Sequence, residues 1–430
     1  MTPTRRTFTK AGSAAVVYNF VKGAALQKAV AANDSLGFGF IGTGIRGMYL
    51  LEEFYKLPGV KALVVADIYD GHHARAKEVT NGAIETTRDY RKVIERKDVD
   101  VVVIATPDHW HKQMALEALA AGKHVYLEKP MCWSIEQCIE VAKAADASGK
   151  IMQIGSGAGM AALTQKTREL IKSGAIGKVN QIRMDTRRNN AEGAWVYAIP
   201  PDASPQTIDW PRFLGPSPKK DFDPKIFFRW RCWWEYSGGV ATDLFVHLLT
   251  MLHQAMDVPA PKSVVSQGGI YRWNDGRTVP DMMESVFDYD GFLANISVNL
   301  GNSFGNQGVM IYGSEGTLQM NSRGSLIHHL EPQQSDVQRY ATNAWPKAMR
   351  EAYFAQNGSP QRPASAKPKE IAMERGTSHQ ELFLECVRGN KQSGEGPWQG
   401  AAAAGAAHLA NLSYRQGRRM SWDWKTGKIS

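Results

Sequence analysis

Two side chains of one predicted helix could do acid–base or metal chemistry. Asp243 and His247 lie four residues apart in SGGVATDLFVHLLTMLHQ (237–254), so on a helix they share one face, one turn apart. They could be metal ligands, a catalytic pair, or the solvated side of an ordinary helix. The stripe that they begin contains no Lys, Glu or Arg, and most of the other side chains are apolar. This pattern favours a buried helix whose stripe lines a cleft.

A glycine-rich stretch near the start of the chain has the spacing of a phosphate-binding loop. GTGIRG follows a short apolar strand at 36–41 and precedes a predicted helix, which is the context that G-x-G-x-x-G requires. Gly42 permits the tight turn, Gly44 lets backbone amides approach a pyrophosphate, and Gly47 allows close helix packing. The alternative is a glycine-rich turn with no ligand. The predicted loop consists of Gly42, Thr43, Gly44, Ile45, Arg46 and Gly47.

An acidic residue at the expected distance strengthens this interpretation. A second strand, in VKALVVADIYD, ends at Asp67, twenty residues after Gly47. At that position a carboxylate accepts hydrogen bonds from the adenosine ribose hydroxyls and repels a 2′-phosphate. The sequence therefore predicts NAD as the cofactor. Arg46 could offset part of the repulsion, which leaves NADP as the alternative.

Two further strand ends carry polar residues. DVDVVVIATPDHWH reads as a buried strand that Thr106 and Pro107 stop, and KHVYLEKP reads as another strand that runs into Glu128 and Lys129. Strands and helices alternate to about residue 155, which predicts a doubly wound parallel sheet. Ligands of such sheets bind beyond the carboxyl ends of the strands. These polar residues are therefore predicted to lie near one ligand.

A metal site is not predicted. His109 and His111 form an H-x-H pair, but no carboxylate or cysteine cluster completes a ligand set around them. The cysteines show neither a C-x-x-C pattern nor the density of a disulfide scaffold, and they read as buried thiols. They are Cys132, Cys138, Cys232 and Cys386.

The N-terminus resembles a twin-arginine export signal. Residues 1–31 contain Arg5 and Arg6, then a mildly apolar run, and end in small residues without any acid. An amphipathic helix is the alternative. Removing them takes away five basic residues, so the formal charge falls from +9 to +4. We therefore expect a periplasmic protein, exported by the twin-arginine pathway, whose basic character belongs partly to its leader.

The composition limits the class of protein and the partners that the rest of the chain can have. Its 430 residues, 43% of them hydrophobic, can bury two ordinary cores. The remaining Lys and Arg are interspersed with acids, so nucleic acid is not an expected partner. After the leader, no apolar run is long enough for a permanent membrane span.

The motifs in combination resemble one known family. GTGIRG with Asp67, TPDHWH, EKP at 128–130, and WR at 230–231 before GGVATDLFVH occur in this order. This combination resembles the Gfo/Idh/MocA family of nicotinamide-dependent oxidoreductases, and the likeness covers nearly the whole mature chain. It implies an NAD-binding Rossmann domain at 35–155 and a C-terminal α/β domain at 156–430 for substrate and oligomerisation. In the family, the second domain has an open, mostly antiparallel sheet whose exposed face often makes dimers or tetramers.

The resemblance also implies site residues. The lysine of E-K-P and the D-x-x-x-H pair form the family's catalytic constellation, and they fall on Lys129, Asp243 and His247. Further cofactor contacts are expected at Thr106, Pro107, His111, Glu128, Lys129 and Arg231. Aromatic residues before the catalytic helix could wall a sugar pocket or simply form a core. The candidates for substrate contact are Trp230, Trp233 and Tyr236.

Four further segments add detail to the prediction. MESVFDYDGFLANISVNLG and GVMIYGSEGTLQMN predict hairpins with YDG and GSEG turns. GSGAGM, after the strand that ends at Gln153, offers small residues where relatives often carry larger polar ones. Residues 331–375 are polar and punctuated by proline, so we expect a surface excursion, with a lid as the alternative.

The predicted chemistry is the oxidation of a secondary alcohol. It needs a hydride acceptor and a base for the hydroxyl proton. We assign the base to His247, whose imidazole is expected to titrate near neutral pH. Lys129 is expected to hydrogen-bond the reacting oxygen or relay its proton, and Asp243 to hold a neighbouring hydroxyl or steady the pair.

The predicted function is an NAD(P)-dependent oxidoreductase that acts on a sugar, polyol or glycoside. Export to a compartment without a free NAD pool predicts a tightly retained cofactor and a redox-neutral net reaction. A redox-assisted, NAD-dependent glycoside-cleaving enzyme is the alternative, and a non-catalytic nucleotide-binding module is a third. A homodimer or homotetramer is expected from the resemblance.

Overall fold

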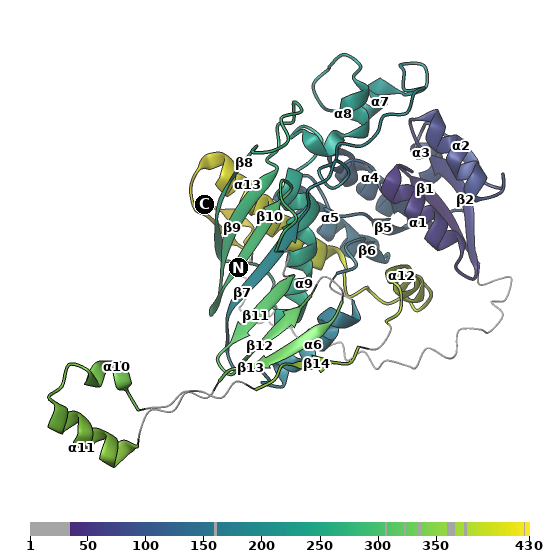
Figure 1. The fold of residues 1–430 in the computed structure, drawn as a ribbon. Helices are drawn as coiled ribbons and strands as arrows, with labels where there is room; N and C mark the ends of the chain where they lie inside the picture. The colour runs from purple at the N-terminus through teal and green to yellow at the C-terminus, as the bar shows by residue number, and fades with distance from the viewer. Residues whose placement is uncertain are drawn as a thin grey trace, which may run out of the picture.

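The computed structural model describes most of the chain. The described residues are 35–158, 161–305, 308–321, 324–332, 337–358, 366–373, 376–424 and 426–430. The predicted twin-arginine signal at 1–31 lies outside them. Two sheets, each with helices packed against it, make up the described part (Figure 1).

The first sheet has six parallel strands in the order β3-β2-β1-β4-β5-β6. The strands are β1 (Leu36–Ile41), β2 (Val60–Ala66), β3 (Glu85–Thr87), β4 (Val101–Ile104), β5 (His124–Leu127) and β6 (Met152–Ile154). Between them run α1 (Ile45–Tyr55), α2 (Asp70–Val79), α3 (Arg91–Ile94), α4 (Asp108–Ala120) and α5 (Ile135–Ser148). All four residues of β4 are buried, as expected for a strand covered on both faces. The predicted doubly wound sheet is confirmed, and its strand order reverses direction between β1 and β4, where such sheets bind ligands.

The second sheet has ten strands in the order β14-β13-β12-β11-β7-β10-β9-β8-β15-β16. Every neighbouring pair is antiparallel except β7 and β10, which confirms the predicted mostly antiparallel sheet. The strands are β7 (Val179–Arg187), β8 (Ser263–Gly269), β9 (Met282–Tyr289), β10 (Phe292–Asn299), β11 (Val309–Gly313), β12 (Gly316–Met320), β13 (Leu326–Leu330), β14 (Lys369–Ile371), β15 (Met420–Asp423) and β16 (Lys428–Ile429). Both predicted hairpins are present, as β9–β10 and β11–β12.

One face of the second sheet is covered by helices and the other is open. The covering helices are α6 (Ala162–Lys172), α9 (Val246–Met256) and α13 (Pro397–Gln416) (Figure 1). Along β9, buried and exposed side chains alternate. On the open face, Val265, Val286 and Leu293 are exposed although they are apolar.

Helix α13 joins the two sheets because its small side chains contribute to both cores. Ala401 and Ala404 pack in the core of the first sheet, whereas Ala403, Ala406 and Ala407 pack in the core of the second. Helix α12 (His379–Arg388) lies nearby and buries Phe383 and Leu384 with the first sheet. Within the described part of the chain, no helix has both the length and the hydropathy to cross a membrane.

The segment 331–375 carries two helices of its own. They are α10 (Arg339–Thr342) and α11 (Lys347–Asn357), which stand apart from both sheets (Figure 1). None of the residues of α11 is buried. Past these helices, β14 returns the chain to the edge of the second sheet beside β13.

The packing of α13 predicts that one glycine-to-alanine substitution in this helix destabilises the protein instead of stabilising it. Replacing a helical Gly by Ala generally stabilises a helix by about 1 kcal/mol. At Gly405 the added Cβ would lie 2.3 Å from Cη2 of Trp422, whose side chain is itself buried. We therefore expect Gly405→Ala to lower the free energy of unfolding by about 1–3 kcal/mol, measured by urea denaturation. A more stable variant would contradict this packing.

Candidate active site

Asp243 lies in a π-helical turn, not in the regular helix that the sequence predicts. The turn, η3, spans Ala241–Phe245, and the Val246 amide donates to the carbonyl of Ala241, five residues earlier. Helix α9 then begins at Val246 and carries His247. A π turn holds more residues per turn than an α-helix, so Asp243 and His247 are not stacked as an i, i+4 pair would be. The wider turn lets the side chain and the carbonyl of Asp243 bind the same cation.

That cation is Lys129, which follows β5. Its Nζ donates to Oδ1 of Asp243 at 2.8 Å and to the Asp243 carbonyl at 2.9 Å. Arg231, in the short helix η2 (Trp230–Cys232), donates from Nε to the same Oδ1 at 3.0 Å. Burial would raise the pKa of the Asp243 carboxyl, but the two positive charges hold it well below its usual range. Asp243 is therefore ionised at neutral pH and joins three elements of the chain.

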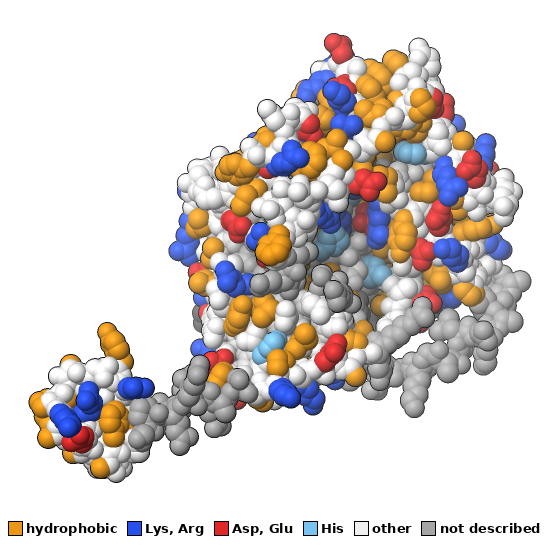
Figure 2. All heavy atoms as spheres, viewed as in Figure 1, with side chains coloured by type: hydrophobic (Ala, Val, Ile, Leu, Met, Phe, Trp, Pro, Cys, Tyr) orange, Lys and Arg blue, Asp and Glu red, His pale blue; other side chains and the backbone are white. Residues whose placement is uncertain are grey.

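Arg231 serves two parts of the site. Besides pairing with Asp243, its guanidinium lies over the ring of Trp230, 4.2 Å from the ring centre, and both residues line a cavity of about 410 Å³. The sequence predicts a cofactor contact for Arg231, and the structure places it between that cavity and Lys129. Figure 2 shows basic and histidine side chains gathered in a hollow near the middle of one face.

His247 does not titrate where the sequence predicts. Burial, reinforced by the charge of Lys129, lowers the pKa of its imidazole to about 3, against the weaker opposing effect of Asp243. The expectation of a group titrating near neutral pH is therefore corrected, because it took no account of burial. The imidazole is neutral at pH 7, the form that can accept a proton. It also shares a hydrogen bond with the backbone of Ser156, in the loop after β6.

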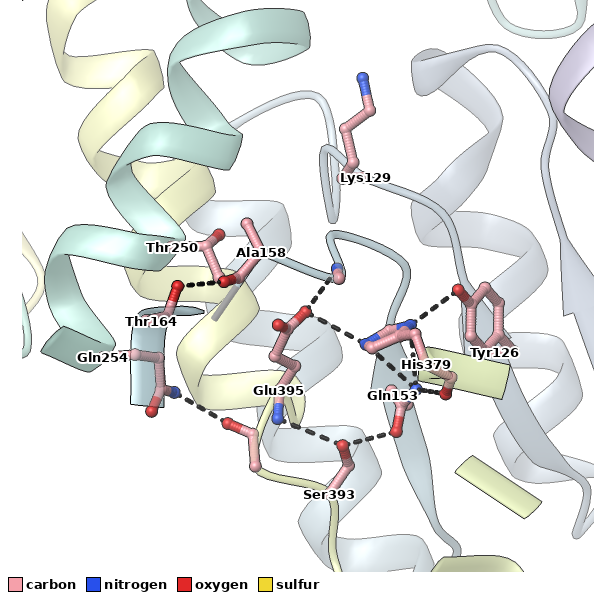
Figure 3. Close-up of polar contacts among 12 residues, drawn as sticks. Tyr126, Lys129, Gln153, Ala158, Thr164, Thr250, Gln254, His379, Ser393 and Glu395 are labelled. Carbon is pink, nitrogen blue, oxygen red and sulfur yellow. Dashed lines mark hydrogen bonds and ion pairs between the residues drawn. The ribbon is translucent and has the colours of Figure 1, made fainter. Parts of the chain in front are cut away.

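The loop after β6 is held by residues from far along the chain (Figure 3). Oε2 of Glu395 accepts from the Gly157 amide at 2.8 Å and lies 3.2 Å from Nε2 of His379. Nδ1 of His379 lies 2.9 Å from the hydroxyl of Tyr126 on β5. Since a carboxylate only accepts, Nε2 of His379 is the atom that donates toward Glu395. Residues 155–158, the described part of GSGAGM, therefore form a loop anchored through its backbone, beside His247.

The glycine loop has the geometry of a dinucleotide cradle. Gly42 has a φ of +80°, and a Cβ at Gly47 would lie 1.9 Å from the Gly42 carbonyl oxygen. Gly44 precedes α1, and a Cβ there would have no neighbour closer than 3.8 Å. The loop therefore leaves space over its amides at a helix N-terminus, which fits a pyrophosphate.

Asp67 is already fully engaged by protein donors. Oδ2 accepts from the amide and the hydroxyl of Thr43, at 2.6 and 3.1 Å. Oδ1 accepts from the Tyr69 amide at 3.0 Å and pairs with His72 at 3.1 Å. Burial opposes ionisation, but His72 and the amides lower the pKa of Asp67 to about 2. A ribose hydroxyl that binds this carboxylate must therefore displace one of these donors, and the His72 ring at the cavity wall is the donor best placed to move.

The other predicted cofactor residues lie along the same edge in different roles. Arg46 donates to Glu128 at 2.6 Å, so the group that could offset repulsion of a 2′-phosphate is itself paired. Thr106 and Pro107 line the cavity. His111 is buried with its ring nitrogens 2.9 and 2.8 Å from the carbonyls of Thr106 and Pro130, and it bridges two strand ends without lining the cavity.

Two of the predicted substrate residues do not line the cavity. Tyr236 is 0% exposed and packs against Phe213, so it supports the site from within an aromatic core. Trp233 is partly buried between two cores. Only Trp230 of the three faces the cavity. Among the described residues, no group of three or more His, Cys, Asp or Glu side chains is arranged to hold a metal ion.

Asp108 is a site residue that the sequence analysis missed. It begins α4, is 2% exposed, and accepts from the Gly238 amide at 3.4 Å, while its Oδ1 has no protein partner. Burial raises its pKa to about 7, Asp243 adds to that effect, and the charges of Arg231 and Lys129 oppose it. The sequence feature that could have identified Asp108 is the position of an acidic residue directly after Thr106–Pro107, at a predicted strand end.

Comparison with known proteins places the chain in a family. The family model described as "Oxidoreductase family, NAD-binding Rossmann fold" matches residues 36–156, and its companion "C-terminal alpha/beta domain" matches 168–421. The chain belongs to the Gfo/Idh/MocA oxidoreductase family, and its first domain is an NAD-binding Rossmann domain. The resemblance stated from the motifs is thus confirmed.

Particular relatives are similar over shorter stretches or in fold alone. A "Glycosyl hydrolase family 109 protein" of Shewanella baltica (strain OS155) is 34% identical over 125 residues, 27% of each chain. An "Alpha-N-acetylgalactosaminidase" of Shewanella oneidensis is 26% identical over 174 residues, 36% of this chain and 38% of the relative. These matches span well under half of the relatives' length.

Solved structures share the fold over almost the whole chain. Levoglucosan dehydrogenase in complex with NADH and levoglucosan has a TM-score of 0.64 at 17% identity, covering 90% of this chain and 99% of its own. GenD2 from gentamicin A biosynthesis, in complex with NAD, has a TM-score of 0.63 at 20% identity, covering 90% and 97%. At these identities the likeness concerns the arrangement of the two domains.

The raised pKa of Asp108 predicts a pH-dependent stability. Between pH 4 and 7 the folded protein holds a proton on Asp108 that the unfolded chain does not, because the unfolded pKa is about 3.9. This contribution is complete below pH 4 and is lost as the pH rises through about 7. The side chain of Asp108→Asn cannot ionise. Between pH 5 and 7, the free energy of unfolding of this variant should therefore rise relative to that of the wild type by up to about 1.4 kcal/mol per pH unit.

Urea denaturation at pH 5, 6, 7 and 8 measures this difference. Asp221→Asn is the matched control, because Asp221 is exposed on the surface. Its stability should follow the wild type at every pH. Parallel curves for Asp108→Asn and the wild type would show that Asp108 keeps the same protonation in both states.

Proposed function

We propose that the protein oxidises and reduces a secondary hydroxyl of a sugar, polyol or glycoside, with NAD as the hydride carrier. The observation that carries this proposal is the buried cluster of Lys129, Asp243 and Arg231, beside the neutral His247 and the Rossmann nucleotide loop. A module that only binds nucleotide would not need these charges, whose burial is costly unless each is paired. Levoglucosan dehydrogenase, solved with NADH and levoglucosan, has the same fold.

Each residue of the cluster has a distinct role in the proposal. When bound, the nicotinamide supplies the hydride acceptor. His247 is unprotonated and can take the hydroxyl proton, while Lys129 can donate a hydrogen bond to the reacting oxygen. Asp243 holds Lys129 in place by accepting two hydrogen bonds from its Nζ, one at the carboxylate and one at the backbone carbonyl. In the reverse direction, the acid and base roles exchange.

The charges around the cavity support NAD over NADP. Asp67 is ionised at the end of β2. Besides Arg46 and Arg231, whose acidic partners are Glu128 and Asp243, three arginines line the same cavity, and each already pairs with an acid. These pairs are Arg88 with Asp70, Arg91 with Glu117, and Arg212 with Asp89. A 2′-phosphate would therefore meet a carboxylate and cations whose charge is already balanced.

The proposal includes export and a retained cofactor. A twin-arginine signal at 1–31 would carry a folded protein to the periplasm, where no free NAD pool is expected. A cofactor that cannot be replaced must be reduced and reoxidised in the same site. The net reaction is then redox-neutral, with one sugar oxidised while another carbonyl compound is reduced.

A second candidate is redox-assisted cleavage of a glycoside. The relatives named as glycosyl hydrolase family 109 proteins and as an alpha-N-acetylgalactosaminidase favour it, with up to 34% identity to part of this chain. In that reaction one substrate is oxidised, cleaved and reduced back. The Lys129 and His247 chemistry is the same, so the two candidates differ in their products.

The proposed assembly is a homodimer or homotetramer built on the open face of the second sheet. The exposed apolar side chains Val265, Val286 and Leu293 on β8, β9 and β10 support this interface. The proposed partners are this second copy and a small carbohydrate. Nucleic acid and a membrane are not expected as partners.

Lys129→Ala and His247→Ala should lose activity without losing the cofactor. Both residues lie at the proposed reacting oxygen and outside the cavity beside the nucleotide loop. We expect turnover to fall on the order of a hundredfold or more in each variant, with NAD affinity within a few-fold of the wild type. Stopped-flow measurement of NADH formation and titration with NAD check the two quantities. Near-normal turnover in either variant would remove that residue from the mechanism.

Product analysis distinguishes the candidate reactions. The protein, purified without added nucleotide, is given sugars singly, then in donor and acceptor pairs, then as glycosides, and the products are identified by mass spectrometry. Turnover of pairs supports the transfer between two sugars, and release of a free sugar from glycosides supports cleavage. Turnover only with stoichiometric consumption of added NAD would contradict a retained cofactor and leave an ordinary dehydrogenase.

A further inference from the structure

A segment of the C-terminal domain lies across the nucleotide edge of the first sheet. Residues 197–214, called here the covering segment, follow β7 and end in α7 (Trp210–Leu214). Figure 1 shows α7 and α8 (Pro224–Phe228) at the same end of the molecule as α2 and α3. The covering segment is joined to the first domain at the ends of three strands, β2, β3 and β4.

At the end of β2 the connection is made by backbone. Tyr69 and Ile208 form an antiparallel bridge, in which the Asp70 amide donates to Thr207 at 3.0 Å and the Asp209 amide donates to Ile68 at 2.9 Å. The bridge lies two residues after Asp67, the residue expected to bind the adenosine ribose. The covering segment therefore continues the edge of the nucleotide site as a short strand.

Side chains strengthen the same connection. The Tyr69 hydroxyl donates to Oδ1 of Asp202 at 2.6 Å, and burial together with this carboxylate raises the pKa of Tyr69 well above its usual value. Beyond β3, Arg88 donates to the Gln206 carbonyl at 3.0 Å. Ile208 is 0% exposed and packs with Tyr69 in an aromatic cluster. The connection thus has a buried apolar centre as well as hydrogen bonds.

The far end of the covering segment is fixed to α4. The Phe213 carbonyl accepts from Nε2 of His109 at 2.9 Å and from Nε1 of Trp110 at 3.0 Å. Arg212 pairs with Asp89 at 3.5 Å. Since α4 follows β4, the covering segment spans the whole edge from β3 to the switch point of the sheet.

The cavity of about 410 Å³ lies between the covering segment and the nucleotide loop. Gly42, Gly44, Arg46 and Asp67 line it from the first domain. Tyr197, Ala198, Pro200, Arg212 and Phe213 line it from the covering segment. A ligand in this cavity would therefore contact both domains, with the covering segment facing the nucleotide loop across it.

We propose that the covering segment is the second wall of the adenosine half of the dinucleotide site and that the nucleotide does not exchange between turnovers. Release would require the Tyr69–Ile208 bridge, the Tyr69–Asp202 bond and the contacts of Phe213 to open together. This inference rests on the proposed function only in taking a nicotinamide dinucleotide as the ligand. It gives the retained cofactor a structural cause.

The N-terminal end of the described chain does not perform this role. Leu36 begins β1, and its amide donates to the Gly59 carbonyl at the start of β2. In a parallel sheet, the starts of the strands lie at the edge opposite the ligand. Leu36 is therefore on the wrong side of the sheet to cover an adenosine.

Two substitutions each remove the hydrogen bond between Tyr69 and Asp202, one by changing the donor and the other by changing the acceptor. Tyr69→Phe and Asp202→Ala each delete the 2.6 Å hydrogen bond, and neither residue lines the cavity. The full chain is loaded with NAD, mixed with excess isotopically labelled NAD, and the bound fraction is followed by mass spectrometry. We expect exchange about three- to tenfold faster in either variant than in the wild type. Because both remove the same bond, the double variant should exchange no faster than the faster single variant.

Asp290→Ala is the matched control, since Asp290 is 91% exposed in the β9–β10 turn and should leave the exchange rate unchanged. Equal exchange rates in the wild type, Tyr69→Phe and Asp202→Ala would overturn the proposal, as would wild-type exchange faster than turnover. If Tyr69→Phe fails to fold, the exposed Asp202 decides the outcome alone. Turnover is measured on the same samples. Retained NAD without sugar oxidation would contradict the proposed function and leave the enclosure standing.

Discussion

The ionised carboxylate of Asp243, held between Lys129 and Arg231, is the interaction on which the rest of the site depends. Each of these charges would be costly to bury alone, so the burial of each depends on its pairing with the others. Lys129 comes from the first sheet, whereas Asp243 and Arg231 come from the domain that follows it. Their pairing fixes how the two sheets meet at the point where hydride transfer would occur. The π turn is the backbone geometry that allows Asp243 to bind Lys129 twice.

A second set of polar contacts completes the surroundings of the cluster from the end of the chain. Glu395 and His379 hold the loop after β6, and that loop in turn contacts His247 through its backbone. Because the loop is anchored through the Gly157 amide, its position does not depend on its small side chains. The backbone hydrogen bond with Ser156 orients the imidazole, while burial and the charge of Lys129 keep it neutral.

The parts of this arrangement that sequence could predict are those set by local periodicity or by turn chemistry. The nucleotide loop follows from strand, glycine spacing and helix, and the β9–β10 hairpin follows from its YDG turn. The π turn at Asp243 could not be predicted, because one widened turn leaves the apolar pattern unchanged. Tyr236 shows a second limit, since an aromatic cluster has the same spacing whether it walls a pocket or fills a core. The pKa of His247 and the enclosure by 197–214 depend on contacts between distant segments, which no local pattern records.

The position of helix α13 in the chain has a consequence for the order in which this protein can fold. This helix occupies residues 397–416, after all strands of the first sheet and after β7–β14 of the second, and its alanines fill the cores of both sheets. Until α13 is in place, each half of the molecule exposes the apolar surface that these alanines cover. Neither core is therefore complete before both halves have closed on one helix that follows them in the chain. Loss of α13 would disrupt the nucleotide domain as much as the second sheet.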